Sequence, residues 1–393
     1  MHPPRRRVGG TLASFVITGV ATILAMGAAS CHAHPLATLG AGSDTAFIGV
    51  AVGLQSPERY ANVYTGVQLA IDELNAARPS GAPVLALRRA PDHAKTHVDI
   101  AAAFRDDPSV IGVVGHTESD PTISVAPIYD DRAHGGKKAL VAISPTAASR
   151  AVTLASEWIF RVTPVVDRQA EILAKYMLDS LHLHRLAIVY RNDVAGREFL
   201  QSFARSAAGA SLLERDPFVE EIAEFDLYAQ RLARAKPDGI VIYANTNNVL
   251  ALIRAVHSAG ITPVIVSTNG PTARELASDA AAARDYNGLR YLSLYSPKRS
   301  ITQASDRFAA AFAQHYGAQP DHWAALSYDA AMLIGQAAQE VGPNRARIRE
   351  WVASVGHGAP DYQGATGDIR FDDWRNPVNK PAVVVTVDAG TSR

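Results

Sequence analysis

The chain has 393 residues, of which 48% are apolar and 19% are charged, so it can fill more than one hydrophobic core and is not a disordered protein. Its 38 basic and 38 acidic side chains give a formal net charge of zero. This balance lacks the basic surface typical of proteins that bind nucleic acids or acidic membranes. We therefore expect neither kind of partner.

The N-terminal segment is typical of an export signal. Arginines at 5–7 precede an apolar run over 12–29, and small residues lead into Cys31. We expect residues 1–30 to be a signal peptide, residues 31–43 to be a flexible tether, and the protein to be exported. The alternative is an uncleaved membrane anchor, because the apolar run is nearly long enough to span a bilayer.

Cys31 is the only cysteine, which excludes an intramolecular disulfide and a site built from several thiolates. The tetrapeptide Ala28-Ala29-Ser30-Cys31 resembles a bacterial lipoprotein box, in which the cysteine is acylated after cleavage, although Ala28 stands where leucine is usual. A soluble exported protein and a lipid-anchored one both remain open. We expect no cofactor and no bound metal.

The first part of the chain alternates strand and helix patterns. Strands are predicted at 47–54, 84–87, 110–114 and 139–143, and helices at 63–77, 97–105 and 122–129. Repeated strand–helix–strand units with right-handed crossovers predict a mostly parallel sheet with helices on both faces.

The same pattern restarts after residue 164. Helices are predicted at 169–181, 197–208, 227–235 and 249–259, and strands at 186–190, 217–219, 239–243, 264–267 and 289–294. Three successive helices follow at 308–315, 323–341 and 345–354, and two strands close the chain at 367–371 and 383–388. We expect a second sheet of the same design, with the three late helices returning to cover the first.

Polar residues follow the predicted strand at 110–114. His116, Thr117, Glu118 and Ser119 come where open α/β sheets bind their ligands, and Asp120 before Pro121 is expected to cap the next helix. The alternative is that these polar residues only cap the helix. Asp167 is likewise expected to cap the helix at 169–181.

Motifs for catalysis are missing from the chain. It has no Gly-x-Ser-x-Gly elbow, no phosphate loop and no dinucleotide-binding fingerprint. His93 and His97 have the spacing of half a metal site on a helix, but no third ligand is near them in sequence, so we interpret them as solvated residues at a helix start. We expect a protein that is not an enzyme.

Several segments together resemble one family. They are FIGVAVGLQSPERYANVYTGVQLAIDELNA, VIGVVGHTESDPTISVAPIYDD, LVAISPTAAS, WIFRVTPVVDRQAEILAKYM, RLAIVYRNDVAGREFL, WAALSYDAAMLI and ATGDIRFDDWRNP. Their order over about residues 46–390 resembles that in type I periplasmic binding proteins, specifically the branched-chain amino acid (Leu/Ile/Val) substrate-binding proteins of ABC transporters.

The resemblance implies an α/β fold of two lobes, each a doubly wound, mostly parallel sheet flanked by helices, joined by three crossovers. Lobe one is expected at 44–164 plus 296–363, and lobe two at 165–295 plus 364–393. The implied function is the solute-binding component of an ABC importer, a monomer that captures a small ligand by hinge closure and delivers it to an inner-membrane permease. The alternatives are a ligand sensor of the same fold and, from a third class, an exported α/β enzyme.

The resemblance also implies binding residues in lobe one. Ser119 matches a position that gives a hydroxyl and an amide to a ligand carboxylate, and Thr146 one that gives a carbonyl to the ammonium. Ala148 replaces a usual threonine, a loss that Ser149 could offset. The neighbouring residues Thr117, Glu118 and Ala147 are expected in the same site, with Tyr60 either as an aromatic wall or on the surface.

Lobe two departs from the family pattern. A usual aromatic residue is replaced near Ala195, a usual tyrosine falls near Asn245, and the acid that pairs with the ligand ammonium falls near Asn269. Since a buried ammonium needs a partner, either Glu118 supplies the charge or the ligand is not a simple α-amino acid. Glu118 could also face water at its helix start. The side-chain amides of Asn245, Asn247 and Asn269 could form hydrogen bonds with an amide, a hydroxyl or a carboxylate of the ligand.

Overall fold

A computed structural model describes residues 45–54, 60–220, 224–297 and 301–388. The described residues belong to one compact unit. The predicted signal peptide, the tether and Cys31 lie outside the described residues. Within the described part, no helix is long and apolar enough to cross a membrane.

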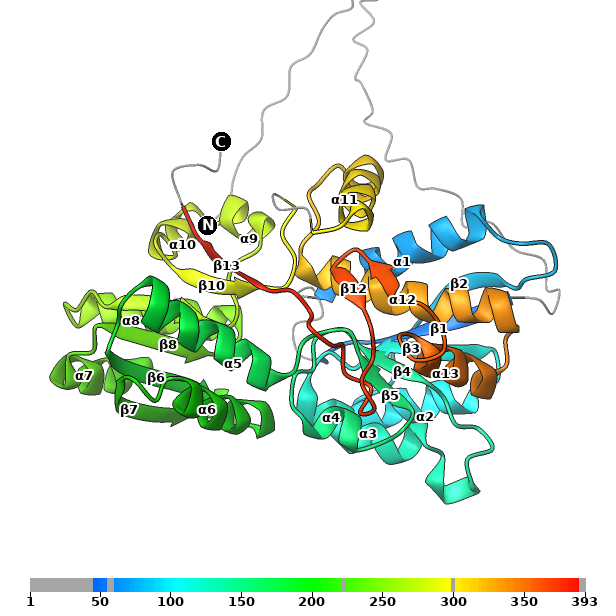
Figure 1. The fold of residues 1–393 in the computed structure, drawn as a ribbon, viewed down its shortest axis with the longest axis horizontal. Helices are drawn as coiled ribbons and strands as arrows, with labels where there is room; N and C mark the ends of the chain where they lie inside the picture. Colours follow the sequence, from blue (N-terminus) through cyan, green and yellow to red (C-terminus); the bar gives the residue numbers. More distant parts are fainter. Residues whose placement is uncertain (1–44, 55–59, 221–223, 298–300, 389–393) are drawn as a thin grey trace, which may run out of the picture. The chain divides into compact units, whose positions relative to one another are not determined.

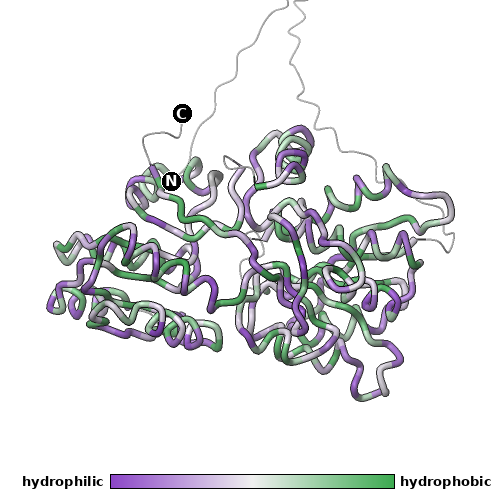
Figure 2. The backbone as a smooth tube through the Cα atoms, viewed as in Figure 1, coloured by the Kyte–Doolittle hydropathy of each residue, from purple (hydrophilic) through white to green (hydrophobic). Residues whose placement is uncertain are grey.

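The first sheet has five parallel strands in the order β2-β1-β3-β4-β5. The strands are β1 (Thr45–Ala51), β2 (Val84–Arg89), β3 (Val110–Gly115), β4 (Ala142–Ser144) and β5 (Ile159–Arg161). Every residue of the central strand β3 is buried, which explains its continuous apolar sequence. Hydrophobic stretches follow the strands of both sheets in Figure 2.

Helices from both ends of the chain cover this first sheet. The early ones are α1 (Ala61–Ala76), α2 (His97–Asp106), α3 (Ser119–Tyr129) and α4 (Ala151–Leu154), and the late ones are α11 (Gln303–Tyr316), α12 (His322–Val341) and α13 (Arg345–Ser354). Figure 1 shows α12 and α13, in orange, beside the blue and cyan strands, and α12 packs along α1 and onto β3. The expectation that the late helices return to the first sheet is confirmed for α12 and α13, which contact β3, whereas α11 contacts β11 and joins the first core through Phe308 and Phe312.

A glycine allows the close packing of α1 on α12. A Cβ atom on Gly66 would lie 2.2 Å from the carbonyl oxygen of Ala324, a distance that no packed structure tolerates. Tyr60 precedes α1 and Trp323 lies in the first turn of α12, so this helix contact also fixes where their rings lie.

The second sheet has six strands in the order β13-β10-β9-β8-β6-β7. They are β6 (Arg185–Arg191), β7 (Ser211–Phe218), β8 (Gly239–Tyr243), β9 (Val264–Ser267), β10 (Arg290–Ser293) and β13 (Val383–Thr386), which alone runs antiparallel to its neighbour. Its helices are α5 (Val166–Lys175), α6 (Val194–Ser206), α7 (Phe225–Ala235), α8 (Thr246–Ser258), α9 (Ala273–Ser278) and α10 (Ala280–Asp285). The predicted second sheet is confirmed, while the expected lobe boundaries remain a prediction.

Two expected helix caps are wrong. Helix α3 begins one residue before Asp120, with Glu118 in the N-cap position, so Asp120 lies inside the first turn. Helix α5 begins at Val166, because the chain turns into it directly after Pro164, and Asp167 is already helical. The Asp167 carboxylate instead accepts hydrogen bonds from Ser202 and Arg205 and so ties α5 to α6.

Short elements escaped the sequence analysis. They are α4, β5, α9, α10, a π-helical turn over Tyr176–Ser180, a 3₁₀ turn over Arg132–His134 and strand β11 (Tyr362–Gly364). The predicted strand at 367–371 is shortened to β12 (Gly367–Ile369), which pairs with β11 in a hairpin and joins neither large sheet. Its turn is held by the buried carboxylate of Asp329, which accepts the amides of Ala365 and Thr366 at 2.7 and 3.0 Å.

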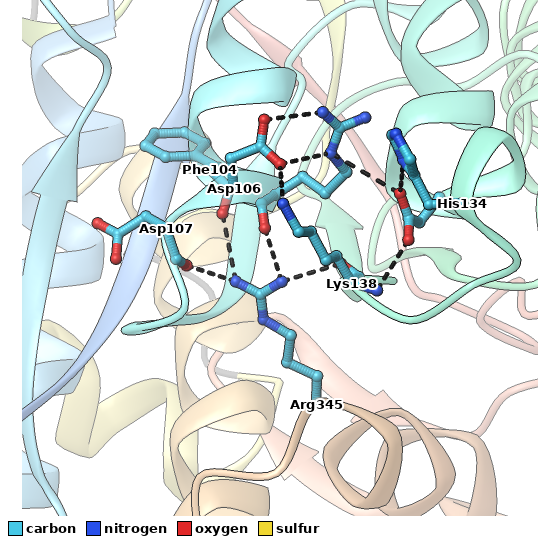
Figure 3. Close-up of polar contacts among 8 residues, drawn as sticks. Phe104, Asp106, Asp107, His134, Lys138 and Arg345 are labelled. Atoms are coloured by element: carbon cyan, nitrogen blue, oxygen red, sulfur yellow. Dashed lines mark hydrogen bonds and ion pairs between the residues drawn. The ribbon is translucent and has the colours of Figure 1, made fainter.

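Arg345 holds helix α13 at the amino-terminal end of strand β3. Its guanidinium donates to the carbonyl oxygens of Val110 and Arg105, both at 2.8 Å, and to that of Lys138 at 2.9 Å. Figure 3 shows this guanidinium among backbone oxygens, with Lys138 turned toward the carboxylate of Asp106. This polar cluster lies at the amino-terminal end of β3, whereas the predicted binding residues follow its carboxyl end. We therefore assign the cluster a role in the stability of the fold.

Candidate functional site

A cavity of about 400 Å³ lies where strands of both sheets end. It is lined by the residues that follow β3, β4, β8 and β9, by the last residues of β6 and β8, and by the starts of α1 and α12. The carboxyl ends of parallel strands are where open α/β sheets bind ligands. A volume in this range is also typical of small-molecule sites.

Nine of the residues that the sequence predicted as ligand contacts line this cavity. These residues are Tyr60, Thr117, Glu118, Ser119, Thr146, Ala147, Ala148, Asn245 and Asn269. Segments far apart in the sequence therefore meet at one place. Whether each side chain touches a ligand remains a prediction.

Ser119 lies at the first position of α3 and is 5% exposed. Its hydroxyl oxygen accepts the backbone amide of Ser149 at 3.2 Å, so its own hydrogen is left to donate to another group. Ser149 does not line the cavity, and its hydroxyl oxygen accepts the amide of Ala151 at 3.1 Å. Ser149 therefore supports Ser119, while the expectation that it offsets the loss at Ala148 remains a prediction.

Thr117 and Thr146 bind the two loops of the first sheet together. The Thr146 hydroxyl donates to the carbonyl oxygen of Thr117 at 2.6 Å, and the Thr117 hydroxyl oxygen accepts the amide of Gly53 at 3.2 Å. These hydroxyls therefore hold the loops in place. Such bonds between loops position backbone groups at the cavity without long side chains.

Glu118 borders the cavity beside an aromatic pair. Its carboxylate accepts a hydrogen bond from the Tyr60 hydroxyl at 2.8 Å, and its side chain remains 38% exposed. The Tyr60 ring meets the Trp323 ring edge-on, with 5.4 Å between ring centres. Tyr60 itself is only 2% exposed, so the alternative that it lies on the surface is wrong.

Arg191 is a charged residue of the site that the sequence analysis missed. Its guanidinium pairs with Asp193 and lies 3.3 Å from Glu220 and 3.9 Å from Glu118. Burial favours the neutral form, but Asp193, Tyr243 and Glu118 outweigh it and raise the pKa of Arg191. Arg191 is the last residue of strand β6, and because open α/β sheets bind ligands at the carboxyl ends of their strands, this position could have predicted it.

The amides of the second sheet are held by their own neighbours. Asn245 caps α8 by accepting the amide of Asn248 at 3.0 Å, and its Nδ2 donates to Glu220. The Nδ2 of Asn269 donates to the carbonyl oxygen of Ala244 at 2.8 Å. Ligand reading by these amides remains a prediction.

The aromatic residue of the second sheet differs from the expected positions. Ala195 is buried in the first turn of α6 and does not line the cavity. Tyr243, at the end of β8, does line it, and its ring packs on Phe199 with 4.9 Å between ring centres. Burial raises the pKa of Tyr243, so its hydroxyl stays protonated.

The start of α12 forms a further wall that no motif predicted. Asp321 caps this helix by accepting the amide of Ala324 at 3.0 Å, and it also accepts the Asn62 amide at 2.6 Å. His322 follows, and burial lowers its pKa although Asp321 and Glu275 act in the opposite direction. These residues were missed because the apolar pattern of the helix suggested only core packing.

The histidines near β3 form a hydrogen-bonded chain instead of a metal site. The Nδ1 atoms of His97 and His116 are 2.9 Å apart, and Nε2 of His116 is 2.9 Å from the Tyr129 hydroxyl. Burial and then His97 lower the pKa of His116 to about 3. His116 directly follows β3 but is fully buried and does not line the cavity, so it is not among the residues that border the candidate site. The described residues contain no cluster of three potential ligands for a metal ion.

Comparison with protein families identifies the family to which this chain belongs. The model of the family described as periplasmic binding protein matches residues 45–392, nearly all of the described chain. The chain belongs to the periplasmic binding protein family. The resemblance inferred from the sequence motifs and the α/β fold class are thereby confirmed, and the members of this family are solute-binding proteins.

Solved structures agree with this assignment. This periplasmic binding protein is similar to LivJ from Streptococcus pneumoniae, a branched-chain amino acid transporter substrate-binding protein in complex with isoleucine, with 23% identity over 88% of this chain and 97% of that one and a TM-score of 0.77. An ABC transporter substrate-binding protein from Desulfitobacterium hafniense, in complex with Leu, is 25% identical over 88% and 98% of the two chains, with a TM-score of 0.72.

A third similar structure carries a different kind of ligand. It is a solute-binding protein of an ABC transporter from R. palustris in complex with benzoate, 16% identical over 88% of this periplasmic binding protein and 94% of that chain, with a TM-score of 0.73. A comparison with functionally curated proteins gave no significant match. The fold is therefore shared among proteins with different ligands, and the ligand has to be argued from the cavity.

Proposed function

We propose that this protein is the exported solute-binding component of an ABC importer and that it captures an amino acid or a closely related small molecule. The observation that supports this most is that Ser119, at the start of α3, and Glu118 border the same cavity. An α-amino acid carries a carboxylate beside an ammonium. A hydroxyl and a carboxylate on neighbouring residues match that pair of charges.

The start of α3 suits the carboxylate of such a ligand. The Ser119 hydroxyl hydrogen is available, because its oxygen already accepts the Ser149 amide. The first amides of a helix have no partner within the helix, and the helix dipole is positive at this end. Both effects favour a bound anion.

Glu118 suits the ammonium. The resemblance implies that the family's acid in the second lobe falls near Asn269, so the negative charge would have to come from another residue. The Tyr60 hydroxyl holds the Glu118 carboxylate at 2.8 Å, which limits the freedom it loses on binding. The first lobe would then bind both α-groups of the ligand.

Capture and delivery would use the two walls of the cavity, one formed by residues of the first sheet and the other by residues of the second. A hinge motion that brings them together would bury most of a small ligand and would give the closed protein a surface that a permease can distinguish from the open one. Export by residues 1–30 would deliver the protein to the periplasm, either free or tethered through Cys31. Binding and release need no covalent chemistry, so the proposed role is not that of an enzyme.

The proposal is tested by ligand screening. The chain without residues 1–30 is heated with individual amino acids, amides and small carboxylates, since a ligand at 100 times its Kd adds about 2.7 kcal/mol to stability. Ligands that raise the Tm are then titrated by calorimetry. We expect α-amino acids among them, and a screen in which none of them raises the Tm would contradict the proposal.

Substitution of Ser119 tests the binding mode. Loss of a hydrogen bond to a charged group costs about 1.5–3 kcal/mol, so Ser119→Ala should raise the Kd about 10- to 100-fold without unfolding the protein. Ser124→Ala is the matched control, because Ser124 is an exposed serine on the same helix that donates to the Pro121 carbonyl. An equal Kd for both variants would remove Ser119 from the site.

A further inference from the structure

The side chains around the cavity are predominantly acidic. The described lining carries the carboxylates of Glu118, Glu275 and Asp321 and the guanidinium of Arg191. His322 is the remaining titratable base, and burial lowers its pKa, so it is neutral at pH 7. The described lining thus carries three negative charges against one positive charge.

The positive charge of Arg191 is already balanced. Asp193, Glu220 and Glu118 all lie within 4 Å of its guanidinium. An anionic group of a ligand would have to compete with these carboxylates. The side of the cavity formed by the second sheet therefore has no unbalanced positive charge for a ligand whose only charge is negative. Benzoate, which the R. palustris protein binds, is such a ligand.

The other two carboxylates lie at the α12 end of the cavity. Asp321, the N-cap of α12, and Glu275, in the first turn of α9, both line the cavity, and both act electrostatically on His322. Among the described side chains neither of them forms an ion pair with lysine or arginine. Each also stabilises the start of a helix, because Asp321 is the N-cap of α12 and Glu275 belongs to the capping box of α9.

Aromatic rings connect this end of the cavity with Glu118. Trp323 packs on His322 with 5.1 Å between ring centres, and Tyr60 touches Trp323 with its ring and Glu118 with its hydroxyl. Indole and phenol rings attract cations through their faces. An extended ligand anchored at Glu118 would run along these rings toward Asp321.

We propose that the ligand carries a second positive charge at the end of its side chain, as lysine, ornithine and arginine do. This inference rests on the proposed function, because it assumes that the α-carboxylate and α-ammonium bind at Ser119 and Glu118. The side-chain cation then lies beside the carboxylates of Asp321 and Glu275. The acidic α12 end would select a basic side chain over an apolar one of the same length.

Calorimetric titration with lysine, norleucine and glutamate tests this selection. The three share the α-groups, and lysine and norleucine have side chains of similar length that differ in charge. We expect lysine to bind roughly tenfold or more tightly than norleucine, and glutamate to bind more weakly than both. Tighter binding of norleucine than of lysine would overturn the inference but leave the proposed function intact, whereas no binding of any α-amino acid would contradict both.

Variants that remove the two carboxylates test whether these residues cause the preference for a basic side chain. Asp321→Asn and Glu275→Gln keep side chains that can still cap their helices, so they remove charge with little change of fold. In the double variant we expect the Kd of lysine to rise more than that of norleucine, so that the preference for lysine falls at least threefold. Asp99→Asn is the control, since Asp99 serves in the capping box of α2 and does not line the cavity. A lysine preference that is the same in the double variant and the control would overturn the inference.

Discussion

The two walls of the cavity are built on different principles. The wall from the first sheet uses short side chains and backbone groups held by loop hydrogen bonds, as in the bond from Thr146 to Thr117 and the support of Ser119 by Ser149. The wall from the second sheet uses the longer side chains of Arg191, Asn245 and Asn269, which bond to neighbouring acids and carbonyls, and Arg191 also lies 3.9 Å from Glu118 of the first wall. The first wall therefore holds its polar groups in fixed positions, while the second carries a set of charges that partly cancel.

The largest effect is expected on the support of the first wall. His116 is buried behind it, and its pKa is lowered from 6.5 to about 3. Below pH 6.5 the unfolded chain binds a proton at this histidine that the folded chain does not, so the free energy of unfolding falls as the pH decreases from 6.5 toward 3. The contribution of this one group is of the order of 4 kcal/mol at the acid end.

Denaturant titrations between pH 3 and 7 measure this effect. In His116→Gln the dependence of the unfolding free energy on pH should be flatter than in the native protein, although the variant is less stable at pH 7. His357→Gln changes an exposed histidine and should keep the native slope. Equal slopes in the two variants would show that His116 does not couple to folding.

The next effect concerns the placement of the aromatic rings of the first wall. Gly66→Ala inserts a Cβ into the contact of α1 with Ala324, where the nearest backbone oxygen is 2.2 Å away. Overpacking of this kind costs about 1–3 kcal/mol and should shift Tyr60 and Trp323, which lie at the starts of these helices. Thermal unfolding and tryptophan fluorescence should both change.

Gly209→Ala provides the comparison, because a Cβ atom added to Gly209 would have no neighbouring heavy atom within 4 Å. It should leave the Tm within about 1 °C of the native value, since surface changes of this kind alter stability by at most about 0.5 kcal/mol. A similar loss in both variants would mean that the contact between α1 and α12 is not what orders the wall.

The second wall is probed by restoring the acid that the family usually has. Asn269→Asp would place a carboxylate against the carbonyl oxygen of Ala244, which the amide now satisfies at 2.8 Å. We expect a loss of about 1–3 kcal/mol in stability and no gain in affinity for amino acids. Tighter binding of leucine by this variant would show that the second wall keeps the family's ammonium site.

The smallest effect is expected for the hydroxyl that links the aromatic wall to the acid. Tyr60→Phe keeps the ring and removes the hydrogen bond to Glu118, a change worth about 0.5–1.5 kcal/mol. The Kd for amino acids should rise about two- to tenfold. Tyr316→Phe removes a similar bond, to the carbonyl of Thr65, away from the cavity, and should leave the Kd unchanged.

Sequence reasoning was most successful where local geometry determines the site. Ser119 and Thr146 follow buried strands, and the sheet architecture alone brings such positions to one edge. Asp120 and Asp167 were given the wrong roles because a helix start can shift by one or two residues, which moves an expected cap into the first turn.

The rest of the cavity depends on contacts between distant segments. Arg191 gains its partners from Glu118 and Glu220, and the start of α12 reaches the cavity only because the late helices pack against α1. His97 looked solvated beside His93, yet it pairs with His116 across two elements. No periodicity or spacing within one segment indicates such partners.

A crystal structure of the protein with a bound amino acid tests the account most directly. We predict that the ligand carboxylate lies within hydrogen-bond distance of the Ser119 hydroxyl and the first amides of α3, with the α-ammonium facing Glu118. A carboxylate held by Arg191 instead, or a ligand bound outside the cavity, would contradict the account.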